Sequence, residues 1–306
     1  MKNKFIKLLL VLFLSTSLVQ CSNKTQNKQA QNTQTQTQNN NTQPINPTDN
    51  TNDVTEFDPY DEEFISQIVF STNPADYSER NGTMLESGKI SSSKYRSVVP
   101  IVYKKDGKSV GYLGTGTIIG PNTVITNKHV TETARQDTSK LEVLLNVGDT
   151  TVSFEVEEII EFNDPIPEQG TFLADLSILH VKPVNNKSIS DGIELFELAT
   201  LEEIQNLKVG DLIEYAGYPG RAQPNLFYDQ EKIVSLGTLT EDGTGNQIEI
   251  KDAISIDSLV QSGQSGSSLL NSDNKIIGLI VGSNETYGSA LRFNETMLNF
   301  IKRNIK

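Results

Sequence analysis

The sequence predicts an all-β protein with two small antiparallel barrels and a C-terminal helix. From Arg96 onward, short runs of apolar and β-branched residues alternate with Gly, Asn, Asp and Pro at short intervals, which is typical of strands joined by turns. These runs form two sets divided near 199–210, which indicates two packed barrels. A crevice between the two barrels is where we expect a functional site.

The strands can be assigned from the apolar runs. The first set is 98–103, 116–119, 123–126, 141–145 and 152–156, and the second is 212–216, 232–236, 247–250, 267–270 and 276–281. The segment 294–305 has a different period, with Asn294 as a candidate N-cap and Met297, Leu298 and Ile301 on one helical face. We therefore expect an amphipathic helix over 294–305.

Composition excludes one class of partner. The 306 residues are 36% hydrophobic, which is enough for a sizeable core, and the formal net charge is −13. Binding to nucleic acid needs clustered Lys and Arg side chains, and this chain does not concentrate them anywhere. We expect a monomer with no nucleic-acid partner.

The N-terminus has the pattern of an export signal. Lys2, Lys4 and Lys7 form a basic region, and Leu8 to Leu14 form an apolar region. A transmembrane helix needs about 20 apolar residues, so this run is too short to span a bilayer. We predict that residues 1–20 are a cleaved signal peptide.

Cys21 is the only cysteine of the sequence, and it follows Leu18, Val19 and Gln20. This segment resembles the bacterial lipoprotein signal L-x-x-C, with Gln20 in place of the usual small residue. The resemblance implies acyl chains on Cys21 that anchor the protein to a membrane at the bacterial cell surface. The alternative is an ordinary secretory cleavage near an incidental cysteine, which would give a secreted protein. In either case no disulfide within the chain is available.

Two segments separate Cys21 from the barrels. Residues 21–55 are nearly all Asn, Gln, Thr and Lys, a composition that cannot bury a core, and we interpret them as a disordered tether. Residues 56–93 are acidic and mixed, with apolar residues at helical spacing over 61–70. They are either an N-terminal extension that packs on the domain or a propeptide that activation removes.

The remaining residues, 94–306, form the predicted domain, with barrels over about 94–200 and 205–292. The chain holds two histidines, and one of them, His129, follows a strand, a turn and a second strand. The segment from Gly114 to Val130 reads G-x-G-x-x-I and then V-x-T-x-x-H. It resembles chymotrypsin-fold serine proteases, particularly the V8-like glutamyl endopeptidases, and this resemblance implies two six-stranded barrels.

A second motif places an acid at the start of a strand. Asp175 precedes the apolar alternation of Leu176, Ile178 and Leu179, which resembles the D-[IL]-[AS]-[IL]-[IL] segment of the same family. Asp175 also lies between the histidine motif and the serine motif in chain order. The second histidine, His180, belongs to this strand, and we expect it to be structural.

The third motif, from Ser262 to Ser267, fits the family pattern G-x-S-G and makes Ser265 the candidate nucleophile. The chain order His, Asp, Ser is that of chymotrypsin-fold enzymes, whereas α/β-hydrolases run Ser, Asp, His and need G-x-S-x-G. The resemblance implies a trypsin-like triad of His129, Asp175 and Ser265. The backbone N–H groups of Gly263 and Ser265 are the expected oxyanion hole, and Gly266 relieves crowding beside the serine. We expect a serine endopeptidase that acts on protein or peptide substrates without a cofactor or metal.

The same comparison addresses specificity. V8-like glutamyl endopeptidases have a histidine in an I-G-x-H segment that contacts the substrate glutamate, and here Ile280 replaces it. A preference for Arg or Lys requires an acid six residues before the nucleophile, where this chain has Leu259. We therefore expect a P1 pocket lined by Leu259, Val260 and Ile280 that takes uncharged side chains.

A function without catalysis is the alternative. Fold does not imply activity, so a protease-like domain could serve as a surface binding module or adhesin. A site that had lost its chemistry is expected to lack at least one triad residue or loop glycine, and this sequence retains them all.

Overall fold

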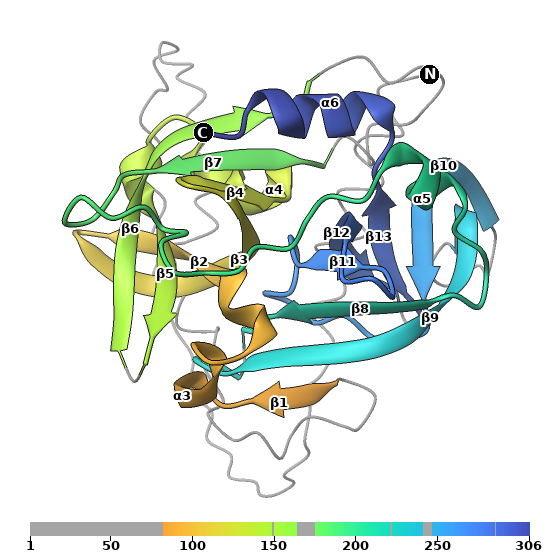
Figure 1. Cartoon of the computed structure of the whole chain (residues 1–306), viewed down its shortest axis with the longest axis horizontal. Helices are drawn as coiled ribbons and strands as arrows, with labels where there is room; N and C mark the ends of the chain where they lie inside the picture. Colours follow the sequence, from red (N-terminus) through yellow and green to blue (C-terminus); the bar gives the residue numbers. More distant parts are fainter. Residues whose placement is uncertain (1–81, 149, 164–174, 221, 241–246, 285) are drawn as a thin grey trace, which may run out of the picture. The chain divides into compact units, whose positions relative to one another are not determined.

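The computed structural model describes residues 82–148, 150–163, 175–220, 222–240, 247–284 and 286–306 (Figure 1). The expected signal peptide, Cys21, the tether and the helix expected over 61–70 lie outside these residues. In the described ranges, none of the helices has the length and apolar character needed to cross a bilayer.

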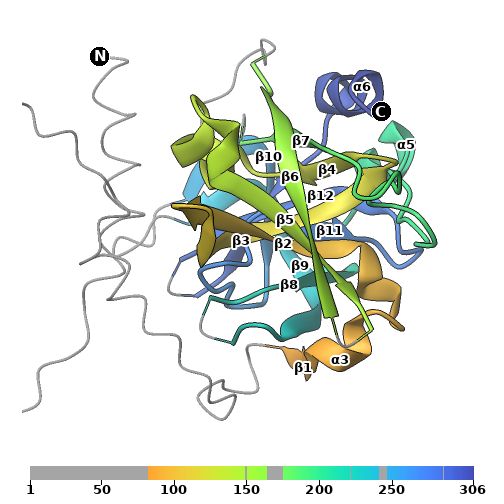
Figure 2. The ribbon, with the colours of Figure 1, turned by 90° about the vertical axis from the view of Figure 1, so that its left-hand side faces the viewer.

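Six antiparallel strands close the first barrel in the order β2-β3-β4-β7-β6-β5 (Figure 2). Their bounds are β2 Val98–Lys105, β3 Lys108–Gly120, β4 Thr123–Thr126, β5 Leu141–Val147, β6 Thr150–Glu161 and β7 Ser177–Val181. Apolar side chains such as Val99, Ile118 and Val143 fill its interior and are fully buried. The barrel core thus comes from the apolar runs that predicted these strands.

The second barrel follows the first in the chain. Its strands are β8 Leu212–Gly217, β9 Leu226–Thr240, β10 Gln247–Ile256, β11 Ser268–Leu270, β12 Ile276–Ser283 and β13 Gly288–Arg292. They run in the order β9-β10-β13-β12-β11-β8, and the pairing of β8 with β9 closes the ring. The prediction of two antiparallel six-stranded barrels is confirmed.

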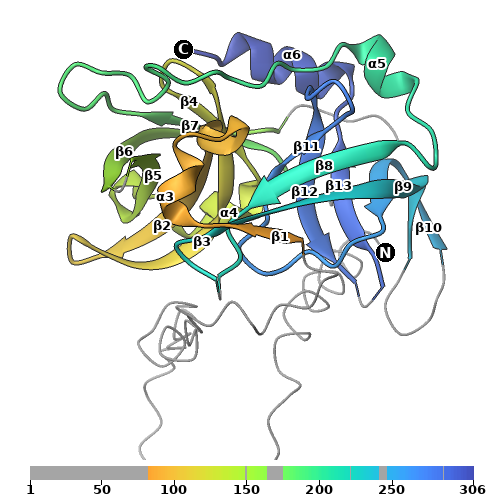
Figure 3. The same cartoon turned by 60° about the horizontal axis from the view of Figure 1, so that its bottom comes forward.

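The segment before the first barrel packs on the second one (Figure 3). Strand β1 (Thr83–Leu85) pairs with β9, and α3 (Ser87–Ile90) and the 3₁₀ turn η3 (Lys94–Ser97) follow it. Ile90 and Tyr95 are buried in a small cluster with residues of β2, β8 and β9. Residues 83–97 therefore pack against the barrels, including the part of the 56–93 segment that begins at Thr83.

Helix α6 (Glu295–Arg303) connects the two barrels at their common edge (Figure 1). Asn294 caps it, as predicted, by accepting a hydrogen bond from the Met297 N–H at 2.9 Å. The Phe300 ring lies edge-on to Phe162 of the first barrel at 5.2 Å. After the helix, the backbone carbonyl of Lys306 accepts a hydrogen bond from the Thr123 hydroxyl on β4, and the Lys306 N–H donates one to it.

His180 holds the end of this helix. Its side chain is buried on β7, with Nδ1 2.8 Å from Glu158 Oε2 and Nε2 2.7 Å from the carbonyl oxygen of Asn304. Both ring nitrogens face acceptors, so His180 joins the C-terminal segment to β6 and β7 of the first barrel.

Buried polar contacts join the barrels to each other. The Thr115 hydroxyl on β3 donates to the carbonyl of Gly263 at 2.8 Å, and the Thr115 N–H donates to the carbonyl of Ser265 at 2.8 Å. Nearby, the Ser268 hydroxyl on β11 donates to the Thr117 hydroxyl at 2.8 Å. A Cβ on Gly266 would lie 2.1 Å from the Thr115 carbonyl oxygen, so only glycine allows the chain to approach β3 this closely.

We predict that Gly266→Ala destabilises the protein far more than Gly107→Ala. Both glycines have positive φ, +86° and +75°, but no atom lies within 4 Å of a Cβ on Gly107. In the Gly107 variant only the strain of a left-handed alanine should lower the free energy of unfolding, by about 1–2 kcal/mol. Gly266→Ala must also separate the barrels, so its free energy of unfolding should fall by at least about 3 kcal/mol. Urea unfolding of both variants measures this difference, and equal losses would contradict the close contact.

Candidate active site

His129 lies just beyond the end of a fully buried strand. All four residues of β4 are buried, and α4 (Lys128–Thr131) begins two residues after the strand ends. This short turn lifts the His129 side chain out of the barrel, where 44% of it is exposed. The first barrel thus presents an accessible imidazole on a rigid support.

The pairing of β4 with β7 brings Asp175 to His129. Thr126 is the Cα partner of Ser177, so the residues following β4 lie beside those preceding β7. Asp175 Oδ2 is 2.6 Å from His129 Nδ1, and Asp175 Oδ1 accepts the His129 backbone N–H at 2.9 Å. The carboxylate therefore contacts both the ring and the backbone of one residue, which fixes the ring orientation.

Asn127 stabilises the pair of His129 and Asp175 from within the first barrel. The sequence patterns did not identify it as a site residue. Its side chain is fully buried, and its Nδ2 donates to the Asp175 backbone carbonyl at 2.9 Å. A polar residue directly after a buried strand was the available signal. Asn127 thus fixes the main chain that carries the carboxylate.

The electrostatic surroundings favour a proton on His129. Burial acts to lower the pKa of His129, but the charge of Asp175 and its hydrogen bond to Nδ1, with a further contribution from Glu132, raise this pKa above its ordinary value. The imidazole is therefore a stronger base than a free histidine.

Ser265 reaches the same junction from the second barrel. It lies in the loop Gln261–Ser267, called here the serine loop, which leads into β11. A Cβ on Gly114 would lie within 3.0 Å of both the Ser265 carbonyl and the side chain of Val130, so the serine backbone and the histidine helix flank one glycine. The Ser265 hydroxyl donates to the Val281 carbonyl at 3.0 Å, and no hydrogen bond joins it to His129 in this structure.

The backbone of the serine loop has a specific hydrogen-bonding pattern. Every carbonyl from Gln261 to Ser265 accepts a hydrogen bond, and the N–H groups of Gln264 and Gly266 donate one. Among the described residues, the N–H groups of Gly263 and Ser265 have no acceptor. Since buried backbone groups are nearly always paired, two unpaired donors beside a serine are what an oxyanion site requires.

The expected pocket residues are only partly brought together. Val260 and Ile280 are buried in one apolar cluster, whereas Leu259 is half-buried and lies outside it. A Cβ on Gly288 would lie 2.9 Å from the Val260 side chain, so the start of β13 packs closely against Val260.

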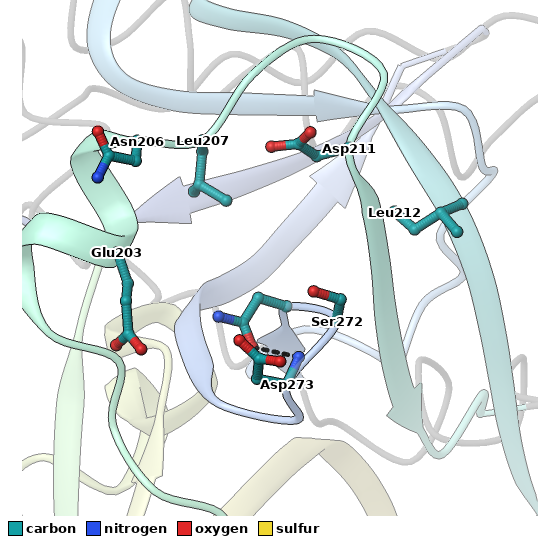
Figure 4. A pocket seen from close by; sticks show the side chains of 8 residues that line it. Glu203, Asn206, Leu207, Asp211, Leu212, Ser272 and Asp273 are labelled. Carbon is teal, nitrogen blue, oxygen red and sulfur yellow. Dashed lines mark hydrogen bonds between the residues drawn. The ribbon is translucent and has the colours of Figure 1, made fainter.

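A hollow of about 340 Å³ lies elsewhere on the second barrel, between α5 (Leu201–Gln205) and the β11–β12 turn (Figure 4). It is lined by Glu203, Asn206, Leu207, Asp211, Leu212, Asn271, Ser272 and Asp273. Lys275 pairs with Glu203 at 2.6 Å. None of the candidate triad residues lines this hollow. Within the described ranges, no three His, Cys, Asp or Glu side chains gather as a metal ion would need.

Comparisons with known proteins address the fold and the family of this chain. The chain resembles a solved structure, the VesB protease of Vibrio cholerae, with a TM-score of 0.55 and 15% sequence identity. The likeness covers 72% of this chain and 66% of the VesB chain, and at this identity it concerns the fold alone. The family model of the trypsin-like peptidase domain matches residues 114–279, more than half of the chain, and includes the three candidate residues. The chain belongs to the trypsin-like peptidase domain family.

Proposed function

We propose that this protein is a serine endopeptidase whose triad is His129, Asp175 and Ser265. The main support is the serine loop, in which all carbonyls from Gln261 to Ser265 are engaged while the N–H groups of Gly263 and Ser265 are not. The pairing of Asp175 with His129 supplies the base. The proposed substrates are proteins or peptides at the cell exterior.

In the proposed mechanism, the Ser265 hydroxyl first turns from the Val281 carbonyl toward His129. Neutral His129 takes the hydroxyl proton at Nε2 as the oxygen attacks the scissile carbonyl, and Asp175 stabilises the imidazolium. The N–H groups of Gly263 and Ser265 stabilise the oxyanion, a contribution of roughly 3–4 kcal/mol per donor. His129 then protonates the leaving amine, and water hydrolyses the acyl-enzyme by the same route.

One observation favours the alternative, a binding module without catalysis. The Ser265 hydroxyl donates to Val281 rather than to His129, so the triad is not fully connected in this structure. Catalysis requires the Ser265 hydroxyl to leave the Val281 carbonyl and turn toward His129, and serine rotamers exchange on a ps–ns timescale. We therefore favour the enzyme.

Export and anchoring complete the proposal. The lipid anchor rests on the pattern from Leu18 to Cys21, which lies outside the described residues, and it stays a prediction. The same holds for the closer likeness to the V8-like glutamyl endopeptidases.

Replacement of the proposed nucleophile tests the function directly. The full chain should hydrolyse unfolded casein and react with a fluorophosphonate probe, and Ser265→Ala should remove both activities, with a rate loss on the order of a millionfold. Ser262→Ala is the matched control, because this serine is exposed on the same loop and its hydroxyl makes no hydrogen bond among the described residues. An unreactive wild-type protein would favour the binding module.

The pH dependence tests the role of the His–Asp pair. Since only neutral His129 can act as a base, kcat/KM should fall as the pH drops through the raised pKa of His129, above about 6.5. Asp175→Asn removes the charge that raises this pKa. The acidic limb of the plot of kcat/KM against pH should therefore move to lower pH, while the plateau of kcat/KM falls by about 10⁴.

Glu132→Gln is the control for this pH prediction. Glu132 raises the pKa of His129 less than Asp175 does, so its loss should shift the limb slightly to lower pH and leave the plateau nearly unchanged. An Asp175→Asn limb at the wild-type position would show that another group governs the profile.

We also propose that the P1 pocket, lined by Leu259, Val260 and Ile280, takes uncharged side chains. A charged P1 residue facing these apolar side chains would lose several kcal/mol of solvation without a partner. Cleavage profiling with a peptide library should show apolar residues at P1. Dominant cleavage after Glu, Arg or Lys would refute this specificity.

A further inference from the structure

Thr115 makes an unusual set of contacts for a side chain in a barrel wall. It is fully buried on β3 of the first barrel, yet its hydroxyl bonds only to the second. The hydroxyl lies 2.8 Å from the Gly263 carbonyl oxygen and 3.0 Å from the Tyr218 backbone nitrogen. Its backbone N–H donates to Ser265, and its carbonyl accepts from the Thr126 hydroxyl at 2.8 Å.

The partners fix the direction of the hydroxyl. The Tyr218 N–H can only donate, so it occupies a lone pair of the Thr115 oxygen. The Thr115 hydroxyl therefore donates its proton to the Gly263 carbonyl oxygen, which can only accept a hydrogen bond. Both bonds are buried, and replacing one partner would leave the other groups unpaired in the protein interior.

These bonds control the peptide group that carries the Ser265 N–H. The Thr115 side chain holds the Gly263 carbonyl, in the peptide group before it, and the Thr115 N–H holds the Ser265 carbonyl, in the peptide group after it. The peptide group between Gln264 and Ser265 is therefore held on both sides by one residue. Rotation of this group would turn its N–H away from the oxyanion.

We propose that Thr115 is a positioning residue that sets the orientation of one oxyanion donor, the Ser265 N–H. This inference rests on the proposed function and deepens it. The Thr115 hydroxyl touches neither substrate nor the proposed triad side chains, and it acts by holding the Gly263 carbonyl. It therefore affects stabilisation of the tetrahedral intermediate and leaves ground-state binding and the base unchanged.

Thr115→Val, which keeps the shape and removes the hydroxyl, tests this proposal in the full chain. For peptide amides whose acylation limits turnover, kcat should fall about 10- to 100-fold, since small misplacements of catalytic groups have this effect. KM should stay within about twofold, and the acidic limb of the pH profile should not move. A peptide boronic acid, whose adduct carries a tetrahedral oxyanion, should bind more weakly by the same factor as kcat/KM.

Two variants separate positioning from general damage. Thr115→Ser keeps the hydroxyl and should stay within about threefold of wild-type kcat. Thr117→Val removes another fully buried hydroxyl of the same junction, the acceptor of Ser268, and should also stay within about threefold. If the valine variant does not fold, Thr115→Ala takes its place, with the same predicted loss of kcat.

The outcomes distinguish this proposal from the one on which it depends. An active wild type with an equally active Thr115→Val, or equal losses in Thr115→Val and Thr117→Val, would overturn only the role of Thr115. A wild type that neither cleaves nor reacts with the fluorophosphonate probe would overturn the proposed function, and this inference with it. A selective loss of kcat that serine restores would establish the positioning role.

Discussion

The hydrogen bonds of Thr115 across the barrel junction are the constraint on which the candidate site depends. A catalytic geometry assembled from two separate barrels tolerates little error, because reacting groups must meet within fractions of an ångström. A purely apolar interface would resist separation, but it is not directional. The hydroxyl and N–H of Thr115 fix the serine loop in orientation as well as distance. The close contact at Gly266 prevents the loop from moving closer to β3.

Each barrel prepares its own part of the site before the junction joins them. The first barrel orients His129 through Asp175 and Asn127, using contacts that lie entirely within its own strands and turns. The second barrel holds the serine loop through its own main chain, for instance between the Gly220 N–H and the Ser262 carbonyl at 2.8 Å. Helix α6 and the residues after it make separate contacts with the first barrel, so the Thr115 hydrogen bonds are not the only contacts that hold the barrels together.

The sequence predicts the barrels because their strands have strong local signals, and β4 occurs where its apolar run predicts it. It does not reveal β13, whose residues Gly288–Arg292 have little strand preference and become a strand by pairing with β10 and β12. The motif order also suggests the contact between His129 and Asp175. The roles of Asn127 and Thr115 could not be predicted, because they depend on which distant backbone groups the fold brings to a short polar side chain. The direction of the Ser265 hydroxyl is likewise set by the Val281 carbonyl: the strand was predicted over 276–281, but the sequence does not show which of its carbonyls faces Ser265.

The most direct test of the account is a crystal structure of the protein with a peptide boronic acid bound. The account predicts a bond between boron and Ser265 Oγ, with one boron-bound oxygen about 3 Å from both the Gly263 and the Ser265 nitrogens. Those two N–H groups should then have the acceptor that they lack among the described residues. A boronate attached to another residue, or an adduct on Ser265 whose oxygens avoid both N–H groups, would contradict the proposed catalytic site.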